Sequence, residues 1–136
     1  MNIFRHILAS AAILCCIPAL AQGPQDERTR QKELQEQIDG EVERHTESLK
    51  LEPWQVFYVD SSLNHDYKAM QDELSKLSKS RVTNSDLYQL VMDNWNERIY
   101  QSFKKILDEN QWARYLKTGG AKDKKARDKR AEKRNH

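Results

Sequence analysis

A five-residue pattern that begins with leucine and ends with glutamine occurs twice in the chain, at residues 51–55 (LEPWQ) and 107–111 (LDENQ). An acidic residue follows the leucine in both copies, Glu52 in the first and Asp108 in the second. Glutamine three positions after such a residue forms a capping box, in which its side chain reaches back to the N–H group of the cap. Pro53 suits the first position of a helix, where its missing N–H group is not needed. Each copy therefore predicts the start of a helix.

Two long helices are predicted between the two copies. From residue 53 to about 80 the apolar residues recur every three or four positions, which is close to the seam of a coiled coil. A second helix runs from about 84 to 106, with Thr83 as its predicted cap, and its apolar residues spread over more than one face. The loop between these helices is short, so we expect them to pack antiparallel.

Shorter or more polar helices are predicted on either side of this hairpin. Residues 27–50 form a highly charged helix whose narrow apolar stripe must lie against a neighbour. The stripe consists of Leu34, Ile38, Val42 and Leu49. Residues 109–118 form a short last helix, and Gly119 with Gly120 predicts its end. The expected fold is all-α, an antiparallel hairpin or small bundle of about four helices, in one domain from residue 22 to 120.

The segment before this domain, residues 1–21, has the features of a cleavable signal peptide. Arg5 supplies a positive charge, residues 7–18 are apolar, and residues 19–21 (ALA) form a small-residue cleavage site. The apolar run is too short to span a bilayer, and the sequence after it is strongly polar. Both cysteines lie in the signal peptide, so cleavage after Ala21 leaves a chain without disulfides. We expect a periplasmic protein with no transmembrane span in its mature chain.

Charge is distributed unevenly along the chain. Residues 22–120 contain 14 Lys and Arg against 18 Asp and Glu, whereas residues 121–136 contain 8 against 3. The apolar residues of this basic tail are all alanines, so we expect a frayed helix or a disordered segment. Such a tail either keeps the protein soluble or contacts anionic surfaces such as lipid headgroups. Export of the protein argues against nucleic acid as its partner.

Sequence patterns that indicate catalysis are absent. There is no Gly-rich phosphate loop, no Gly-x-Ser-x-Gly, no His-Glu-x-x-His and no cysteine after the signal peptide. Glu41 with His45, and His65 with Asp66, could share a metal ion across a dimer, but a zinc site needs three or four converging ligands. We therefore expect a protein that is not an enzyme and that holds no metal or other cofactor.

Five aromatic side chains are candidates for a polypeptide-binding surface. On the helix that starts at residue 53, Trp54 and Tyr58 point away from the apolar seam and Phe57 lies to one side. Trp112 and Tyr115 belong to the apolar face of the short last helix. These side chains either pack against a neighbouring helix or form a contact surface, for a second copy of the chain or for apolar segments of other proteins.

The signal peptide, the helical mature chain and the two Leu-x-x-x-Gln helix starts resemble the LTxxQ-motif family of periplasmic proteins (the Spy/CpxP type), over about residues 49–116. The positions that match the motif are Leu51, Gln55, Leu107 and Gln111. The motif threonine is replaced by Glu52 in one copy and by Asp108 in the other. The resemblance implies a long antiparallel helical hairpin that dimerises into a curved cradle, and a role as an ATP-independent chaperone, a regulator of envelope stress or a metal sensor.

Together, the resemblance and the aromatic residues predict an ATP-independent holdase, a homodimer that binds unfolded or partly folded polypeptides. One alternative is a regulatory or structural module of the envelope stress response that recognises a single folded envelope protein. A metal-responsive relative is the third interpretation.

Overall fold

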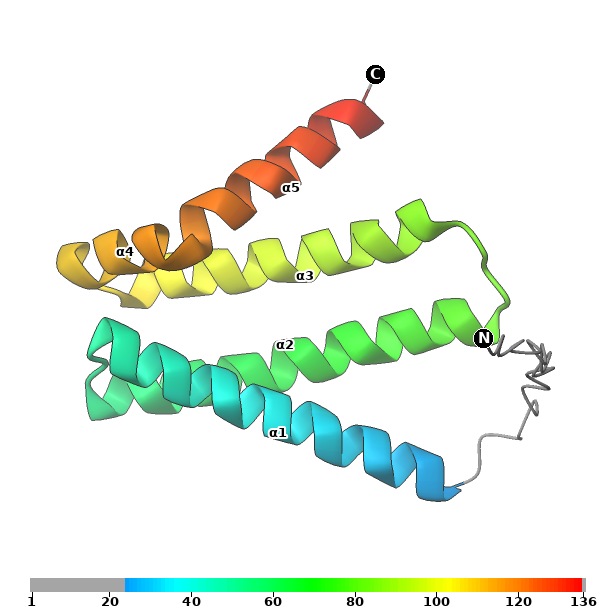
Figure 1. Ribbon diagram of the computed structural model, residues 1–136, viewed down its shortest axis with the longest axis horizontal. Helices are drawn as coiled ribbons and strands as arrows, with labels where there is room; N and C mark the ends of the chain where they lie inside the picture. The colour runs from blue at the N-terminus through cyan, green and yellow to red at the C-terminus, as the bar shows by residue number, and fades with distance from the viewer. Residues whose placement is uncertain (1–23, 136) are drawn as a thin grey trace, which may run out of the picture.

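The computed structural model describes residues 24–135 as five α-helices with short connections and no strand in this range (Figure 1). The helices are α1 (Pro24–Leu49), α2 (Pro53–Lys79), α3 (Ser85–Ile106), α4 (Glu109–Tyr115) and α5 (Ala121–Arg134), and a wide π-type turn, Leu116–Gly120, joins the last two. The predicted all-α fold is confirmed, and α1 to α4 correspond to the four predicted helices. None of the helices in the described part is long and apolar enough to cross a membrane. The predicted signal peptide lies outside the described residues.

The helices α2 and α3 lie side by side and antiparallel, and the other helices pack on this hairpin (Figure 1). α1 crosses α2 near the turn that joins them and diverges from it toward its own N-terminus. α4 turns back over the end of α3, and α5 then runs along α3 and diverges from it toward the C-terminus. The starts of α2 and α4 are thus at the same end of the hairpin, which we call the motif end.

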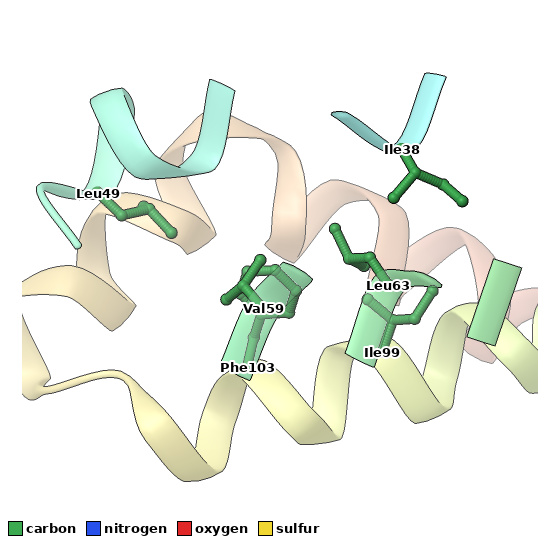
Figure 2. Close-up of a cluster of buried hydrophobic side chains, with 6 residues drawn as sticks. All are labelled: Ile38, Leu49, Val59, Leu63, Ile99 and Phe103. Carbon is green, nitrogen blue, oxygen red and sulfur yellow. The ribbon is translucent and has the colours of Figure 1, made fainter. Parts of the chain in front are cut away.

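The hydrophobic core lies near the motif end. Figure 2 shows six buried side chains, two each from α1, α2 and α3: Ile38, Leu49, Val59, Leu63, Ile99 and Phe103. The apolar stripe predicted for α1 is confirmed, because Ile38 and Leu49 are fully buried and the other two stripe residues pack against this cluster. Toward the turn between α2 and α3 the apolar side chains are only half-buried, and Leu87 is 42% exposed. The hairpin is therefore tightly packed at one end only.

The start of α3 differs from the sequence prediction by one residue. Asn84, and not Thr83, is the N-cap, and its side-chain oxygen accepts a hydrogen bond from the N–H group of Asp86 at 2.9 Å. Asparagine is among the best N-cap residues because its short side chain reaches the free N–H groups of the first turn. Thr83 is left exposed in the loop before the helix.

The chain changes direction between α4 and α5 at a pair of glycines. Gly119 has a φ of 133°, a backbone angle that residues other than glycine rarely adopt. At Gly120, a Cβ atom would lie 2.6 Å from the ring of Tyr115. The chain thus changes direction at the glycine pair, where the sequence predicts the end of the helix. The basic segment that follows forms the helix α5, which packs against α3.

Candidate functional site

The two motif glutamines meet in the interior, although Gln55 and Gln111 are 56 residues apart in the chain. Their side-chain amides bind each other: Gln55 Nε2 donates to Gln111 Oε1 at 2.7 Å, and Gln111 Nε2 donates to Gln55 Oε1 at 2.9 Å. Each Oε1 atom also accepts the N–H group of its own cap residue, Glu52 at 2.8 Å or Asp108 at 3.1 Å. Each glutamine therefore completes a capping box and at the same time binds the other glutamine.

The remaining donors of this glutamine pair hold two carbonyl groups at helix ends. Gln55 Nε2 donates to the carbonyl of Ile106 at 2.9 Å, and Gln111 Nε2 donates to the carbonyl of Lys50 at 3.2 Å. The two glutamines are 3% and 5% exposed, and both donors and both acceptor sites of each amide are used. The pair joins the starts of α2 and α4 to the ends of α1 and α3. It has no free group for a ligand, so we assign these motif residues a structural role.

Trp112 and Tyr115 lie in an aromatic cluster at the motif end. The ring of Tyr115 stacks on that of Phe103, with centroids 5.1 Å apart, and on that of Trp112 at 5.3 Å. Tyr100 meets Trp112 edge to face at 5.1 Å. Aromatic pairs of this kind stabilise a core beyond the area that they bury. Of the five candidate binding residues, these two are therefore half-buried in the packing of α4 on α3.

His45 brings α1 into the same cluster. It is 8% exposed, and its ring centroid lies 4.8 Å from that of Phe103 and 6.0 Å from that of Tyr115. Burial and the charge of Arg44 lower the pKa of His45 to about 4, against the opposite effect of Glu41. Burial also raises the pKa of Tyr115 to about 12. His45 is therefore neutral at pH 7 and packs as one more ring of the core.

Trp54, Phe57 and Tyr58 form an exposed group on the first turns of α2, which we call the α2 aromatic patch. Their exposed fractions are 55%, 74% and 39%. Their spacing of three and four residues makes them neighbours on one side of the helix. The indole N–H group of Trp54 donates to the carboxylate of Glu52 at 2.8 Å, which orients the ring. Tyr58 also lines a shallow groove between α2 and α3. Aromatic side chains exposed together in this way are typical of a contact surface.

A polar cleft of about 430 Å³ lies between α1 and α5, above the α2–α3 hairpin. Charged side chains on its walls are paired with one another, Arg44 with Glu41 on α1 and Arg130 of α5 with Asp93 of α3. Pairing leaves little net charge in the cleft to attract an ionic ligand. We therefore interpret it as a solvated space between diverging helices.

Ion pairs hold α5 against α3, and we call this set of contacts the arginine clamp. Asp93 accepts from Arg130 Nη2 at 2.6 Å and from Arg134 Nη1 at 3.1 Å. One helical turn further on, Glu97 accepts from Arg127 Nη2 at 3.2 Å. Burial opposes the ionisation of Asp93, but hydrogen bonds from Arg130 and its other donors outweigh burial and hold its pKa below the ordinary value. The clamp orders the helix that follows the glycine pair.

The two histidine–carboxylate pairs noted in the sequence remain pairs. Glu41 and His45 lie 3.5 Å apart, and His65 lies 2.8 Å from Asp66. Asp66 is also bound by Arg98 at 3.1 Å, and a cation already occupies that carboxylate. Within the described part of the chain, no three side chains of histidine, aspartate or glutamate lie together in a way that would hold a metal ion.

Sequence reasoning missed two features, the contact between the glutamines and the arginine clamp. The identical position of the glutamine in both copies was the available signal for the first, because two equal helix starts at one end of a hairpin can meet. For the second there was no distinctive signal, because the four-residue spacing of Asp93 and Glu97 recurs elsewhere in the chain, as in Asp39 and Glu43.

Comparison of the chain with protein-family models, with curated proteins and with solved structures gives no significant match. Membership of the LTxxQ-motif family is therefore a hypothesis that rests on the signal peptide and the two motif copies.

Proposed function

We propose that this protein is exported to the periplasm and binds apolar segments of unfolded or partly folded polypeptides without ATP. The observation that carries the proposal is the joint exposure of Trp54, Phe57 and Tyr58 on a helix whose other large apolar side chains are buried or half-buried. Recognition of an apolar segment by such a surface needs neither a deep pocket nor a cofactor. The family resemblance supports the same function.

Charge around the α2 aromatic patch indicates which polypeptides bind best. Glu52 contacts Trp54 directly, and Asp60 follows the patch on the same helix. Residues 22–120 as a whole carry more acidic than basic side chains. Apolar segments flanked by lysine or arginine are therefore the preferred clients, because opposite charges speed association and favour the bound state.

The experiment that tests this function is suppression of the aggregation of a denatured client by residues 22–136, at stoichiometric amounts, followed by light scattering. Wild-type protein suppresses the scattering, and Trp54→Ser with Phe57→Ser removes most of the effect. Leu87→Ser is the control, since Leu87 is also exposed but lies in the first turn of α3, at the other end of the hairpin, and it keeps full activity. Absence of suppression by folded wild-type protein rejects the proposal.

A homodimer is part of the proposal, and the α2 aromatic patch is either its client surface or its dimer contact. The two roles are separated by measuring the mass of the protein alone by light scattering, together with the aggregation assay. If Phe57→Ser leaves the dimer intact and abolishes suppression of aggregation, the patch binds clients. If the same change yields monomers, the patch is the contact between copies.

The compactness of the patch favours one alternative, a regulatory or structural module that recognises a single folded envelope protein. Three clustered aromatic side chains have the size of a hot spot, where a few residues supply most of the binding energy. A pull-down from envelope extract distinguishes the alternatives. One dominant protein, lost with Phe57→Ser, supports the regulatory module, whereas a mixed set of proteins supports the holdase.

A further inference from the structure

The basic helix α5 has two sides of different composition. Its three arginines face α3 in the arginine clamp. Four lysines occupy another side: Lys122, Lys125, Lys129 and Lys133. At about 100° per residue these lysines fall within a sector of about 80°. All four are exposed. Arginine and lysine are thus segregated on this helix, and we call the second set the lysine stripe.

The arginine clamp fixes which side of α5 faces solvent. Arg127 is 8% exposed and binds Glu97, and Asp93 receives hydrogen bonds from the other two arginines. The apolar residues of α5 are all alanines, so ion pairs hold this helix on α3 in place of a hydrophobic face. Because the arginines form ion pairs with acidic side chains of α3, the lysines of the stripe face solvent.

The stripe lysines form no direct ion pair in the described part of the chain, although Asp128 and Glu132 line the same shallow hollow as Lys125 and Lys129. Within the described residues, the ion pairs of α5 involve Lys124 and the three arginines, and none of them involves a lysine of the stripe. From Lys122 to Lys133 the helix rises about 16 Å at 1.5 Å per residue. The four lysines of the stripe thus follow one side of α5, the helix that diverges from α3 toward the C-terminus (Figure 1).

We propose that the lysine stripe docks the protein on a bilayer surface that contains anionic lipids. A row of positive charge complements a flat array of lipid phosphates, and basic residues near such a surface gain binding energy one by one. α5 carries no large apolar side chain, so it lies on the headgroups and does not enter the acyl chains. The inference rests on the proposed export, which brings the chain to a membrane surface, and it uses a different helix from the α2 aromatic patch.

Sedimentation of residues 22–136 with lipid vesicles tests the proposal. The protein binds vesicles of equal parts phosphatidylcholine and phosphatidylglycerol at low salt, and it does not bind phosphatidylcholine alone. Binding weakens as salt rises, because the screening length falls to about 10 Å at 0.1 M. Glutamine at all four stripe positions lowers partitioning by about two orders of magnitude or more, since each lysine contributes about fivefold and the four factors multiply.

A variant with the same loss of charge elsewhere is the matched control. It replaces four exposed lysines of α2 and α3 by glutamine: Lys76, Lys79, Lys104 and Lys105. This control binds anionic vesicles like wild type, and both variants keep their helical circular dichroism. An equal loss in the control, binding to neutral vesicles, or binding to duplex DNA without binding to vesicles overturns the proposal.

The aggregation assay, run without lipid, separates this inference from the proposed function. The stripe variant still suppresses aggregation, because the α2 aromatic patch is unchanged. If wild-type protein binds anionic vesicles through the stripe but never suppresses aggregation, the proposed function fails and the docking surface stands.

Discussion

Two polar networks join the helices of this protein, the glutamine pair at the motif end and the arginine clamp between α3 and α5. The glutamine pair is neutral, almost fully buried and saturated with hydrogen bonds. The arginine clamp is charged and partly open to solvent, with the side chains of Arg130 and Arg134 39% and 30% exposed. A buried neutral network keeps its strength when salt is added, whereas partly exposed ion pairs weaken as salt rises.

The networks also differ in what they hold. The glutamine pair connects four helix ends beside the hydrophobic core, so its loss affects the whole fold. The arginine clamp holds a single helix whose apolar residues are all alanines. We infer that the glutamine pair holds the motif end at any salt concentration and that the docking of α5 weakens as salt rises.

The largest expected effect is that of Gln55→Ala. The change removes the partner of one donor and one acceptor site of the buried Gln111 amide, and it also removes the partners of the Ile106 carbonyl and the Glu52 N–H group. It also opens a small cavity. We expect the free energy of unfolding to fall by about 2–4 kcal/mol in urea denaturation. Gln37→Ala is the control, because this exposed glutamine of α1 should change stability by less than about 0.5 kcal/mol. Equal effects of the two changes would contradict a structural role of the pair.

Acid should destabilise the motif end through His45. Its pKa in the folded protein is about 4, below the ordinary 6.5, so as pH falls the unfolded chain takes up the proton first. Stability is therefore full above pH 6.5, declines as pH falls toward 4, and levels off below that. The decline is about 2–3 kcal/mol when residual solvent contact is allowed for. In His45→Phe, which keeps an aromatic ring, the free energy of unfolding from urea titrations should lose this slope, and an unchanged slope would rule out His45 as its source.

Asp93→Asn should release α5 with little effect on the rest of the fold. The change removes the charge that binds Arg130 and Arg134. We expect amide hydrogen exchange in α5 to speed up about tenfold, and the global free energy of unfolding to fall by only about 1 kcal/mol. Asp128→Asn is the matched control, because among the described residues the ion pair of Asp128 is with Lys124 of the same helix. Faster exchange throughout the core, and not in α5 alone, would show that the clamp is not local.

The pH at which α5 is released should also be lower than the pH at which protonation of His45 begins to weaken the motif end. The pKa values of Asp93 and Glu97 lie below their ordinary 3.8 and 4.5, because hydrogen bonds to their carboxylates outweigh the effect of burial. Their contribution is complete above the ordinary values and is lost only as pH falls through the lowered ones. Hydrogen exchange should therefore show α5 still docked at pH 5, where His45 already weakens the core, and release of α5 at that pH would contradict this order.

The smallest expected effect on stability is that of Phe57→Ser. This side chain is 74% exposed, so its loss should change the free energy of unfolding by less than about 0.5 kcal/mol. Thermal melting of the variant checks this expectation. A large destabilisation would show that Phe57 packs in the folded protein and would remove it from the α2 aromatic patch.

Local sequence signals predicted the helices well, because a helix start depends on residues within one turn. The acidic residue, Pro53 and the glutamine of the first motif copy determine where α2 begins, and periodicity determines which side of α1 is buried. The cap of α3 was missed by one residue because Thr83 and Asn84 are both good caps in sequence. Such a choice is decided by backbone geometry.

Contacts between distant residues could not be predicted in the same way. Gln55 and Gln111 each have a complete local explanation as part of a capping box, so nothing in either copy required a partner. Asp93 and Glu97 could not be singled out among the 18 acidic residues of the helical domain without the path of α5. The five candidate aromatic residues differ in burial for the same reason. The exposure of Trp54 follows from its position on α2, whereas the half-buried state of Trp112 depends on how α4 folds over α3.

A double-mutant cycle on Gln55 and Gln111 tests whether the two motif copies stabilise each other. The free energy of unfolding is measured by urea denaturation for wild type, for each change to alanine and for the double variant. If the amides act as one buried unit, the double variant costs little more than either single one, with a coupling energy of at least about 1 kcal/mol. Additive effects, with coupling below about 0.5 kcal/mol, would show two independent capping boxes and would contradict a direct contribution of the contact between the two motif copies.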